Sequence, residues 1–167
     1  MPTATLLTLD QFERLPDTDG IQELLDGELI EMPPPKRRHS ELCKNLEGLL
    51  RRVLDSSRIW LETGFSIAGH CPQPDVAVIF PDHGMDRGWF AEAPMVAIEV
   101  ASRGNTPEQL EWKKELYLAH GAQEVWLVYD KTRTVVVHRP DGQAITYKAD
   151  FQSLPLKTLI DFDAVFQ

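Results

Sequence analysis

Short runs of apolar, often β-branched residues recur along the chain between Pro, Gly and Asp residues, which is typical of strands buried in a sheet. The predicted strands cover residues 59–68, 75–80, 95–101, 124–130, 134–140 and 144–150. Ahead of them, two further segments flank Asp26-Gly27, a strong signal for a two-residue hairpin turn. The pattern therefore predicts an N-terminal hairpin followed by a larger sheet.

Helical periodicity occurs in three places. Thr8 and Gln11 stand at capping-box spacing, which predicts a short helix ending near residue 14. Residues 36–55 have apolar side chains at steps of three and four and basic residues largely on the other face; the apolar set is Leu42, Leu46, Leu49, Leu50 and Val53. A third helix is predicted from Thr106-Pro107 to Gly121. The order of elements predicts an α/β or α+β fold, a sheet with helices on its faces, rather than a doubly wound nucleotide fold.

Length and composition limit the possible classes of protein. With 167 residues and 43% hydrophobic content, the chain fits one domain covering residues 1–167. Cys43 and Cys71 fit neither a disulfide framework nor a four-ligand zinc site. No signal peptide or run long enough to span a membrane is found, so we expect a soluble, cytoplasmic protein with no membrane partner.

Two acids occupy unexpected places in the predicted strands. Asp75 follows Pro74 at the start of an apolar run, and Glu99 lies inside another. A buried carboxylate is costly unless it is paired or binds a metal, and the segment between the two strands can turn the chain so that they lie side by side. The acids would then share a hard cation, which prefers oxygen ligands, with the main-chain carbonyl of Val100 as a further ligand. The alternative is that Asp75 caps a turn and Glu99 forms a salt bridge.

Three further sets of side chains are candidates for chemistry. Lys113 lies on the apolar side of the third helix, where it would hold an attacking water or stabilise charge on a phosphate. The alternative is that Lys113 snorkels to solvent at the helix edge, where Lys114 would offer an equivalent solvent charge. His39 would contact a phosphate or orient a ligand near the start of the second helix, or be structural. Basic residues cluster around that helix start, and Lys36, Arg37 and Arg38 are candidates for binding nucleic acid or form a solvated face.

The segments PDVAVI, IEVAS and KKELYLAHGAQEVWLVYD, together with LTLDQFERLP and QELLDGELIEMPPP, resemble the Uma-type restriction endonuclease family, a bacterial branch of the PD-(D/E)xK nuclease superfamily. The resemblance covers nearly the whole chain. It implies a restriction-endonuclease-like core, a mixed β-sheet flanked by helices. It also implies that Asp75 and Glu99 bind Mg²⁺ or Mn²⁺.

The resemblance carries over to individual residues as well. The superfamily's catalytic lysine position, two residues after the second acid, is Ala101 here, and Lys113 matches the lysine that the Uma-type branch carries on the next helix. Glu23 matches an early acidic residue and is an expected accessory ligand acting through water. Gln109, with Glu108 beside it, stands where an acid commonly precedes the helix lysine, a departure that could change metal affinity or activity.

These features favour a metal-dependent phosphodiesterase that cleaves DNA. The net charge of −9 argues against binding nucleic acid by bulk electrostatics alone, but a bound divalent ion supplies local positive charge. The alternative is a catalytically inactive, nuclease-like binding or adaptor protein. A structural protein that self-associates through exposed edges in strands 134–140 and 144–150 is a third possibility, compatible with either function. Cleavage of both DNA strands would favour a homodimer.

Overall fold

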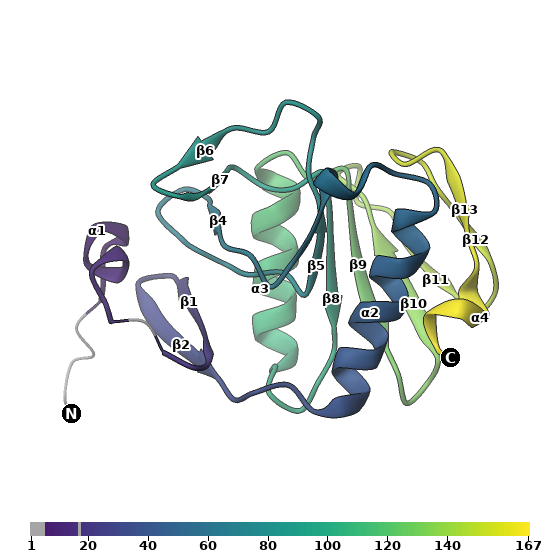
Figure 1. Cartoon of the computed structure of the whole chain (residues 1–167), viewed down its shortest axis with the longest axis horizontal. Helices are drawn as coiled ribbons and strands as arrows, with labels where there is room; N and C mark the ends of the chain where they lie inside the picture. Colours follow the sequence, from purple (N-terminus) through teal and green to yellow (C-terminus); the bar gives the residue numbers. More distant parts are fainter. Residues whose placement is uncertain (1–5, 17) are drawn as a thin grey trace.

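The computed structural model describes residues 6–16 and 18–167, so part of the predicted 1–167 domain lies outside the described residues (Figure 1). Its central element is a six-stranded sheet with the strand order β11-β10-β9-β8-β5-β3. Strands β8 and β9 are parallel, and the other neighbouring pairs are antiparallel. The strands are β3 (Ile59–Leu61), β5 (Val76–Val78), β8 (Val96–Val100), β9 (Glu124–Tyr129), β10 (Thr134–His138) and β11 (Ala144–Tyr147). The predicted mixed sheet is confirmed.

Helices cover both faces of this sheet (Figure 1). On one face, α2 (Arg37–Arg51) buries an apolar stripe that includes Leu46 against a core containing Ile98 of β8. On the opposite face, α3 (Pro107–Ala119) packs Tyr117 against a second core containing Ala97. Because successive side chains of a strand point to opposite faces, Glu99 shares the α3 side with Ala97. The buried acid therefore faces α3.

The start of α3 follows from its local sequence. Thr106 and Gln109 form a capping box, and Pro107 occupies the first turn, as predicted. The helix ends at Ala119, and Gly121 follows with φ +110°, a backbone conformation that favours glycine. Helix α3 connects the parallel strands β8 and β9, which need a crossover of this kind. Its position relative to β8 is thus set by capping and by the crossover.

The N-terminal elements also agree with the pattern. Helix α1 (Leu9–Glu13) begins with the predicted capping box, and β1 (Ile21–Leu25) pairs with β2 (Glu28–Met32) around Asp26-Gly27. Both turn residues have positive φ, 51° and 78°, as a type I′ turn requires. Backbone hydrogen bonds between Leu24 and Cys71 attach the hairpin to the segment that leads into β5.

The structure differs from the prediction in two boundaries and in one segment that was expected to contain no strand. Residues 59–68 form two strands in different sheets, since Glu62 adopts a positive φ of 46° that interrupts the extended backbone between β3 and β4 (Phe65–Ser66). Strand β4 pairs with β7 (Trp89–Ala91), and β7 pairs with β6 (Met85–Asp86). Strands β6 and β7 lie in the segment between β5 and β8, which was expected only to turn the chain. Helix α2 ends at Arg51 instead of continuing to residue 55, and the side chain of Val53 is exposed.

Elements beyond residue 147 complete the core on the α2 side. They are β12 (Phe151–Ser153), β13 (Thr158–Ile160) and α4 (Phe162–Val165); a 3₁₀ turn, η1 (Ser56–Arg58), precedes β3. Segment 134–140 contains β10, which lies between β9 and β11 and presents no free edge, so only β11 fits the predicted self-association edge. No helix among residues 6–16 and 18–167 combines the length and apolar character needed to cross a lipid bilayer.

Candidate active site

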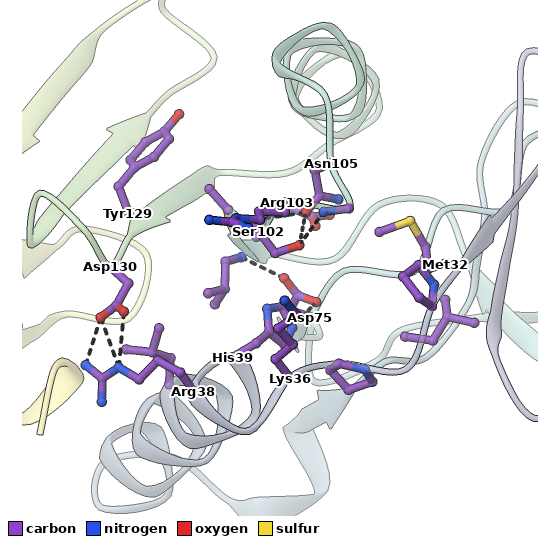
Figure 2. A pocket seen from close by; sticks show the side chains of 18 of the residues that line it. Met32, Lys36, Arg38, His39, Asp75, Ser102, Arg103, Asn105, Tyr129 and Asp130 are labelled. Atoms are coloured by element: carbon purple, nitrogen blue, oxygen red, sulfur yellow. Dashed lines mark hydrogen bonds and ion pairs between the residues drawn. The ribbon is translucent and has the colours of Figure 1, made fainter.

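A cleft of about 690 Å³ opens where β5 begins and β8 ends, between the start of α2 and the loop that leads into α3 (Figure 2). Its lining includes all five acidic, basic and imidazole side chains predicted at the catalytic centre: Glu23, His39, Asp75, Glu99 and Lys113. These residues come from β1, α2, the segment before β5, β8 and α3. The fold thus brings together residues that are far apart in the sequence.

Asp75 lies opposite Glu99 because β5 and β8 are antiparallel neighbours. Val76 pairs with Ile98, and the same register places the preceding aspartate across from the following glutamate. The N–H of Val100 donates to Oδ2 of Asp75 at 2.6 Å. Since the N–H and C=O of a strand residue point to the same edge, the carbonyl of Val100 also points toward the Asp75 side.

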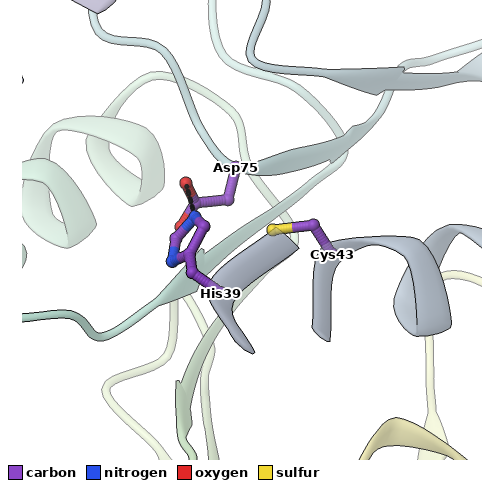
Figure 3. A group of neighbouring side chains, drawn as sticks. All are labelled: His39, Cys43 and Asp75. Carbon is purple, nitrogen blue, oxygen red and sulfur yellow. Dashed lines mark hydrogen bonds and ion pairs between the residues drawn. The ribbon is translucent and has the colours of Figure 1, made fainter. Parts of the chain in front are cut away.

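The other oxygen of Asp75 contacts α2. Nε2 of His39 lies 3.1 Å from Oδ1 of Asp75, and the side chains are 12% and 14% exposed (Figure 3). This hydrogen bond raises the pKa of His39, against the lowering effect of burial. The thiol of Cys43, one turn along the helix, lies beside them, and burial raises its pKa. His39 therefore orients the carboxylate of Asp75.

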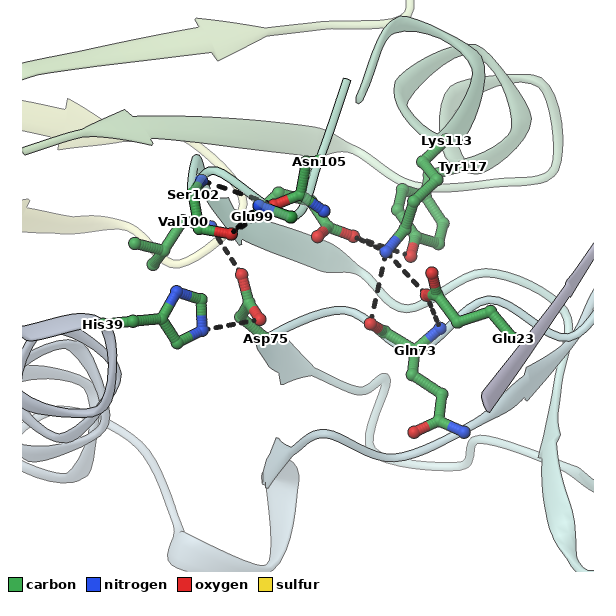
Figure 4. A network of polar contacts seen from close by, with 11 residues as sticks. Glu23, His39, Gln73, Asp75, Glu99, Val100, Ser102, Asn105, Lys113 and Tyr117 are labelled. Carbon is green, nitrogen blue, oxygen red and sulfur yellow. Dashed lines mark hydrogen bonds and ion pairs between the residues drawn. The ribbon is translucent and has the colours of Figure 1, made fainter. Parts of the chain in front are cut away.

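Glu99 is 2% exposed and is held by two donors from α3 (Figure 4). The hydroxyl of Tyr117 donates to Oε1 of Glu99 at 3.0 Å, and Nζ of Lys113 lies 2.7 Å from the same oxygen. Among the described residues, no hydrogen bond reaches Oε2 of Glu99. One oxygen is thus fixed by the helix and the other remains available as a ligand atom.

Lys113 links two acids at the floor of the cleft. Its ammonium donates to Oε1 of Glu23 at 2.7 Å and to the carbonyl of Gln73 at 3.3 Å, besides its contact with Glu99. Glu23 also accepts the backbone N–H of Gln73 at 2.6 Å. The three protons of the ammonium therefore have three acceptors, and the predicted orientation of Lys113 toward the sheet is confirmed.

The acids outnumber the cations in this buried network. Burial raises the pKa of Glu99 to about 8, with Asp75 and Glu23 adding to the rise and Lys113 opposing it. Burial lowers the pKa of Lys113, but Glu23 and Glu99 more than compensate, so the amine remains charged. Carboxylate and carbonyl oxygens are the ligands of hard divalent cations. The donor set of Asp75, Glu99 and the Val100 carbonyl therefore fits such a cation, whose positive charge would favour the ionised form of Glu99.

Comparison with known proteins gives the family. Residues 9–164 match the model of the Uma2 family, described as "Putative restriction endonuclease". The chain belongs to the Uma2 family. A crystal structure of a "putative nuclease belonging to DUF820" from Anabaena variabilis superposes with a TM-score of 0.85 and 24% identity, covering 96% of this chain and 97% of that one. This likeness shows that the two chains share a fold. No curated protein matches the chain.

The three basic residues predicted to contact nucleic acid have different environments in this Uma2 member. Arg38 forms a two-pronged contact with Asp130, at 2.8 to 3.2 Å (Figure 2). It also donates to the main-chain oxygens of Phe166 and Gln167. Arg37 pairs with Glu41 at the surface and does not line the cleft. Lys36 lines the cleft and has no ion pair among the described residues. Of the three, only Lys36 is both unpaired and at the cleft.

Gln109, the departure from the Uma-type pattern, does not reach the catalytic centre. Its Oε1 accepts the backbone N–H of Thr106 at 3.0 Å, and its own N–H donates to the Thr106 hydroxyl. It is a helix cap that does not line the cleft. The expected effect of this position on metal affinity therefore has no support in the contacts of the side chain.

Four residues in or next to the cleft were not predicted from the sequence: Gln73, Arg103 and Lys131 line it, and Tyr117 lies behind it against Glu99. Tyr117 was treated as a packing residue, although a buried tyrosine hydroxyl usually requires a partner and here finds Glu99. Gln73 supplies a carbonyl to Lys113, for which side-chain patterns give no signal. Arg103 and Lys131 lie on loops at the rim, where the sequence has no periodicity that would predict their direction.

Proposed function

We propose that this Uma2 protein is a metal-dependent endonuclease that hydrolyses DNA phosphodiester bonds. The observation that carries the proposal is the pairing of Asp75 and Glu99 on adjacent strands, with the ammonium of Lys113 at 2.7 Å from Glu99, on the floor of a cleft. The family description supports nuclease chemistry in general. Metal dependence and the DNA substrate are our inference from the donor set and from the charges around the cleft.

Asp75, Glu99 and the Val100 carbonyl would hold Mg²⁺ or Mn²⁺. Such an ion polarises a scissile phosphate and lowers the pKa of a bound water. His39 positions Asp75 through the contact at Oδ1, which leaves the second lone pair of each aspartate oxygen for a ligand. Tyr117 and Lys113 act in the same way on Oε1 of Glu99, so both carboxylates are preorganised.

Lys113 has a second role in this proposal. Its ammonium lies at the cleft floor, where it would orient the attacking water or stabilise the negative charge that develops on the phosphate during in-line displacement. To do so it exchanges one of its three present acceptors, the most distant of which is the Gln73 carbonyl at 3.3 Å. Glu23 then keeps the amine charged while acting as an accessory group, reaching any cation only through water.

The DNA backbone would be held by basic side chains at the rim. Lys36, Arg103 and Lys131 are exposed, line the cleft and form no ion pair among residues 6–16 and 18–167. They come from three separate segments of the chain that meet at the cleft. This local concentration of positive charge offsets the overall charge of −9 where a phosphate backbone would approach. Cleavage of both strands would be completed by a homodimer, which places two such clefts on one duplex.

Plasmid nicking with Mg²⁺ or Mn²⁺ tests the proposal. We expect the wild type to nick supercoiled DNA and Asp75→Asn, Glu99→Gln and Lys113→Ala each to lose at least about a hundredfold in rate, because each removes a group that acts on the reacting phosphate. Lys114→Ala is the matched control and should retain activity, since Lys114 pairs with Glu111 and Glu115 away from the cleft. Equal rates in all five proteins would exclude the proposal.

The alternative is an inactive binding or adaptor protein. Its argument was the missing acid at Gln109, and the capping contacts of Gln109 give this argument no further support. The overall negative charge is its other support. Calorimetric titration with Mn²⁺ separates the two functions: binding that Asp75→Asn abolishes favours the enzyme, whereas a wild type that binds no Mn²⁺ favours the adaptor.

A further inference from the structure

A second set of ligand atoms lies next to the proposed magnesium site. Donor atoms of His39, Cys43 and Asp75 all lie within 4.8 Å of one another (Figure 3). His39 and Cys43 are four residues apart on α2, so they project from the same face of the helix, and Asp75 meets them from the start of β5. The set therefore combines an imidazole nitrogen, a sulfur and a carboxylate oxygen.

The types of ligand atom distinguish this set from the oxygen ligands around Glu99. Imidazole, thiolate and carboxylate are the ligands of Zn²⁺, whereas Mg²⁺ is bound through oxygen. A tetrahedral zinc ion is bound at about 2.0–2.3 Å from its ligands, so the three donor atoms would need only a small inward movement. A thiolate selects against Mg²⁺ and Mn²⁺, which prefer oxygen ligands.

The surroundings of His39 permit that movement. Its Nδ1 is buried and has no hydrogen-bond partner within the described part of the chain, so the contact of Nε2 with Asp75 is the only polar contact that holds the ring. Asp75 and His39 both line the cleft, which gives an ion a route from solvent and leaves room for water at a fourth position. Cys43 is 5% exposed and lies one helical turn deeper.

We propose that His39, Cys43 and Asp75 form an inhibitory zinc site. Zinc binding forms a Zn–S bond and breaks the S–H bond of Cys43, and the proton leaves to solvent; when the imidazole is charged, a second proton leaves Nε2 of His39. Because Asp75 belongs to both sites, zinc takes the aspartate that the magnesium site requires. The inhibitory part of this inference rests on the proposed nuclease function, whereas zinc binding does not.

Cd²⁺, a spectroscopic substitute for zinc, tests binding without any nuclease assay. The ultraviolet absorption of a cadmium–thiolate bond should develop on titration of the wild type and of Cys71→Ala, in which Cys43 is the remaining cysteine. It should be absent in Cys43→Ser, whose thermal unfolding verifies that it folds. His39→Gln should weaken zinc affinity at least about tenfold. No band in the wild type, or an undiminished band in Cys43→Ser, would overturn the proposal.

The inhibitory effect is tested separately with plasmid nicking in Mg²⁺. Zinc should inhibit the wild type at concentrations that leave Cys43→Ser active, because the serine variant retains every group assigned to hydrolysis. Equal zinc inhibition of the two proteins would overturn the inhibitory role. If the wild type does not nick DNA at all, the nuclease proposal fails, and the cadmium titration still decides whether the zinc site exists.

Discussion

Replacing Lys113 by methionine isolates the energy of the buried ion network. The ammonium lies 2.7 Å from an oxygen of Glu23 and 2.7 Å from an oxygen of Glu99, and the three side chains are 2–4% exposed. At an effective dielectric constant of about 20, a contact between two full charges at this distance contributes roughly 6 kcal/mol of attraction. The Glu23 contact provides this attraction at neutral pH, whereas the Glu99 contact provides it in full only above the raised pKa of about 8. Desolvation of the charged groups, at several kcal/mol each, cancels much of the attraction. Removing the lysine leaves the desolvation cost without its compensation.

We therefore expect Lys113→Met to lower the free energy of unfolding by about 3–5 kcal/mol. With a denaturant dependence of about 2 kcal/mol per molar urea, the midpoint would move by about 2 M. Equilibrium urea unfolding monitored by tryptophan fluorescence measures the shift in buffer without divalent ions. Lys114→Met is the control: its partners Glu111 and Glu115 are 59% and 74% exposed, so its loss should stay below about 1 kcal/mol.

The comparison between these two adjacent lysines decides whether the reasoning holds. The expectation fails if the two variants lose the same free energy of unfolding, or if the free energy of unfolding of Lys113→Met lies within about 1 kcal/mol of the wild-type value. Either result would show that the buried lysine does not compensate the two acids. The assignment of Lys113 over Lys114 would then lose its physical basis.

Three further predictions concern pH, packing and capping. The pKa of Glu99 is raised to about 8, so between the ordinary carboxyl pKa and pH 8 the metal-free native protein binds more protons than the unfolded chain does. The free energy of unfolding should therefore fall as the pH rises through this window. Mg²⁺ should reduce that fall, because it binds the ionised form of Glu99. Urea midpoints at several pH values with and without Mg²⁺ test this, and a rise with pH in the metal-free protein would contradict it. Leu46→Ala, in a core residue that is 1% exposed, should cost about 2–5 kcal/mol by the same unfolding assay. Thr106→Ala should cost about 1 kcal/mol by removing the cap of α3, and a cost near zero would show that the capping box is unimportant.

Much of the site could be predicted because its two acids lie on antiparallel strands close in sequence. A segment that turns the chain between two apolar runs makes adjacent pairing probable, so Asp75 and Glu99 could be placed together before any coordinates. The direction of Lys113 followed from helical periodicity, since Leu116 and Tyr117 mark the same face.

Contacts between distant segments could not be predicted in the same way. The pairing of His39 with Asp75 depends on how α2 lies across the end of the sheet, which side-chain periodicity does not determine. Arg38 has the composition of a phosphate-binding residue, yet it pairs with Asp130 and the C-terminal backbone, because the chain end returns to α2. The sequence around Arg38 does not predict that the C-terminal segment packs against α2.

The interruption after β3 is a similar case at the level of the backbone. Glu62 is neither a glycine nor a proline, so its residue type does not predict a break in the strand. Its positive φ nevertheless ends β3, and the following residues pair with β7 in the small sheet. No strand is predicted after residue 150, because the two strands that follow have only three residues each. Such short strands give too few alternations for a periodicity argument.

A crystal grown with Mn²⁺ and measured for anomalous scattering tests the central claim most directly. The account predicts a peak within about 2.0–2.6 Å of a carboxylate oxygen of Asp75 and of Glu99, the range that hard cations keep from oxygen ligands. A map with no peak at this position, or with manganese bound only away from these two carboxylates, would contradict the proposed metal-dependent site.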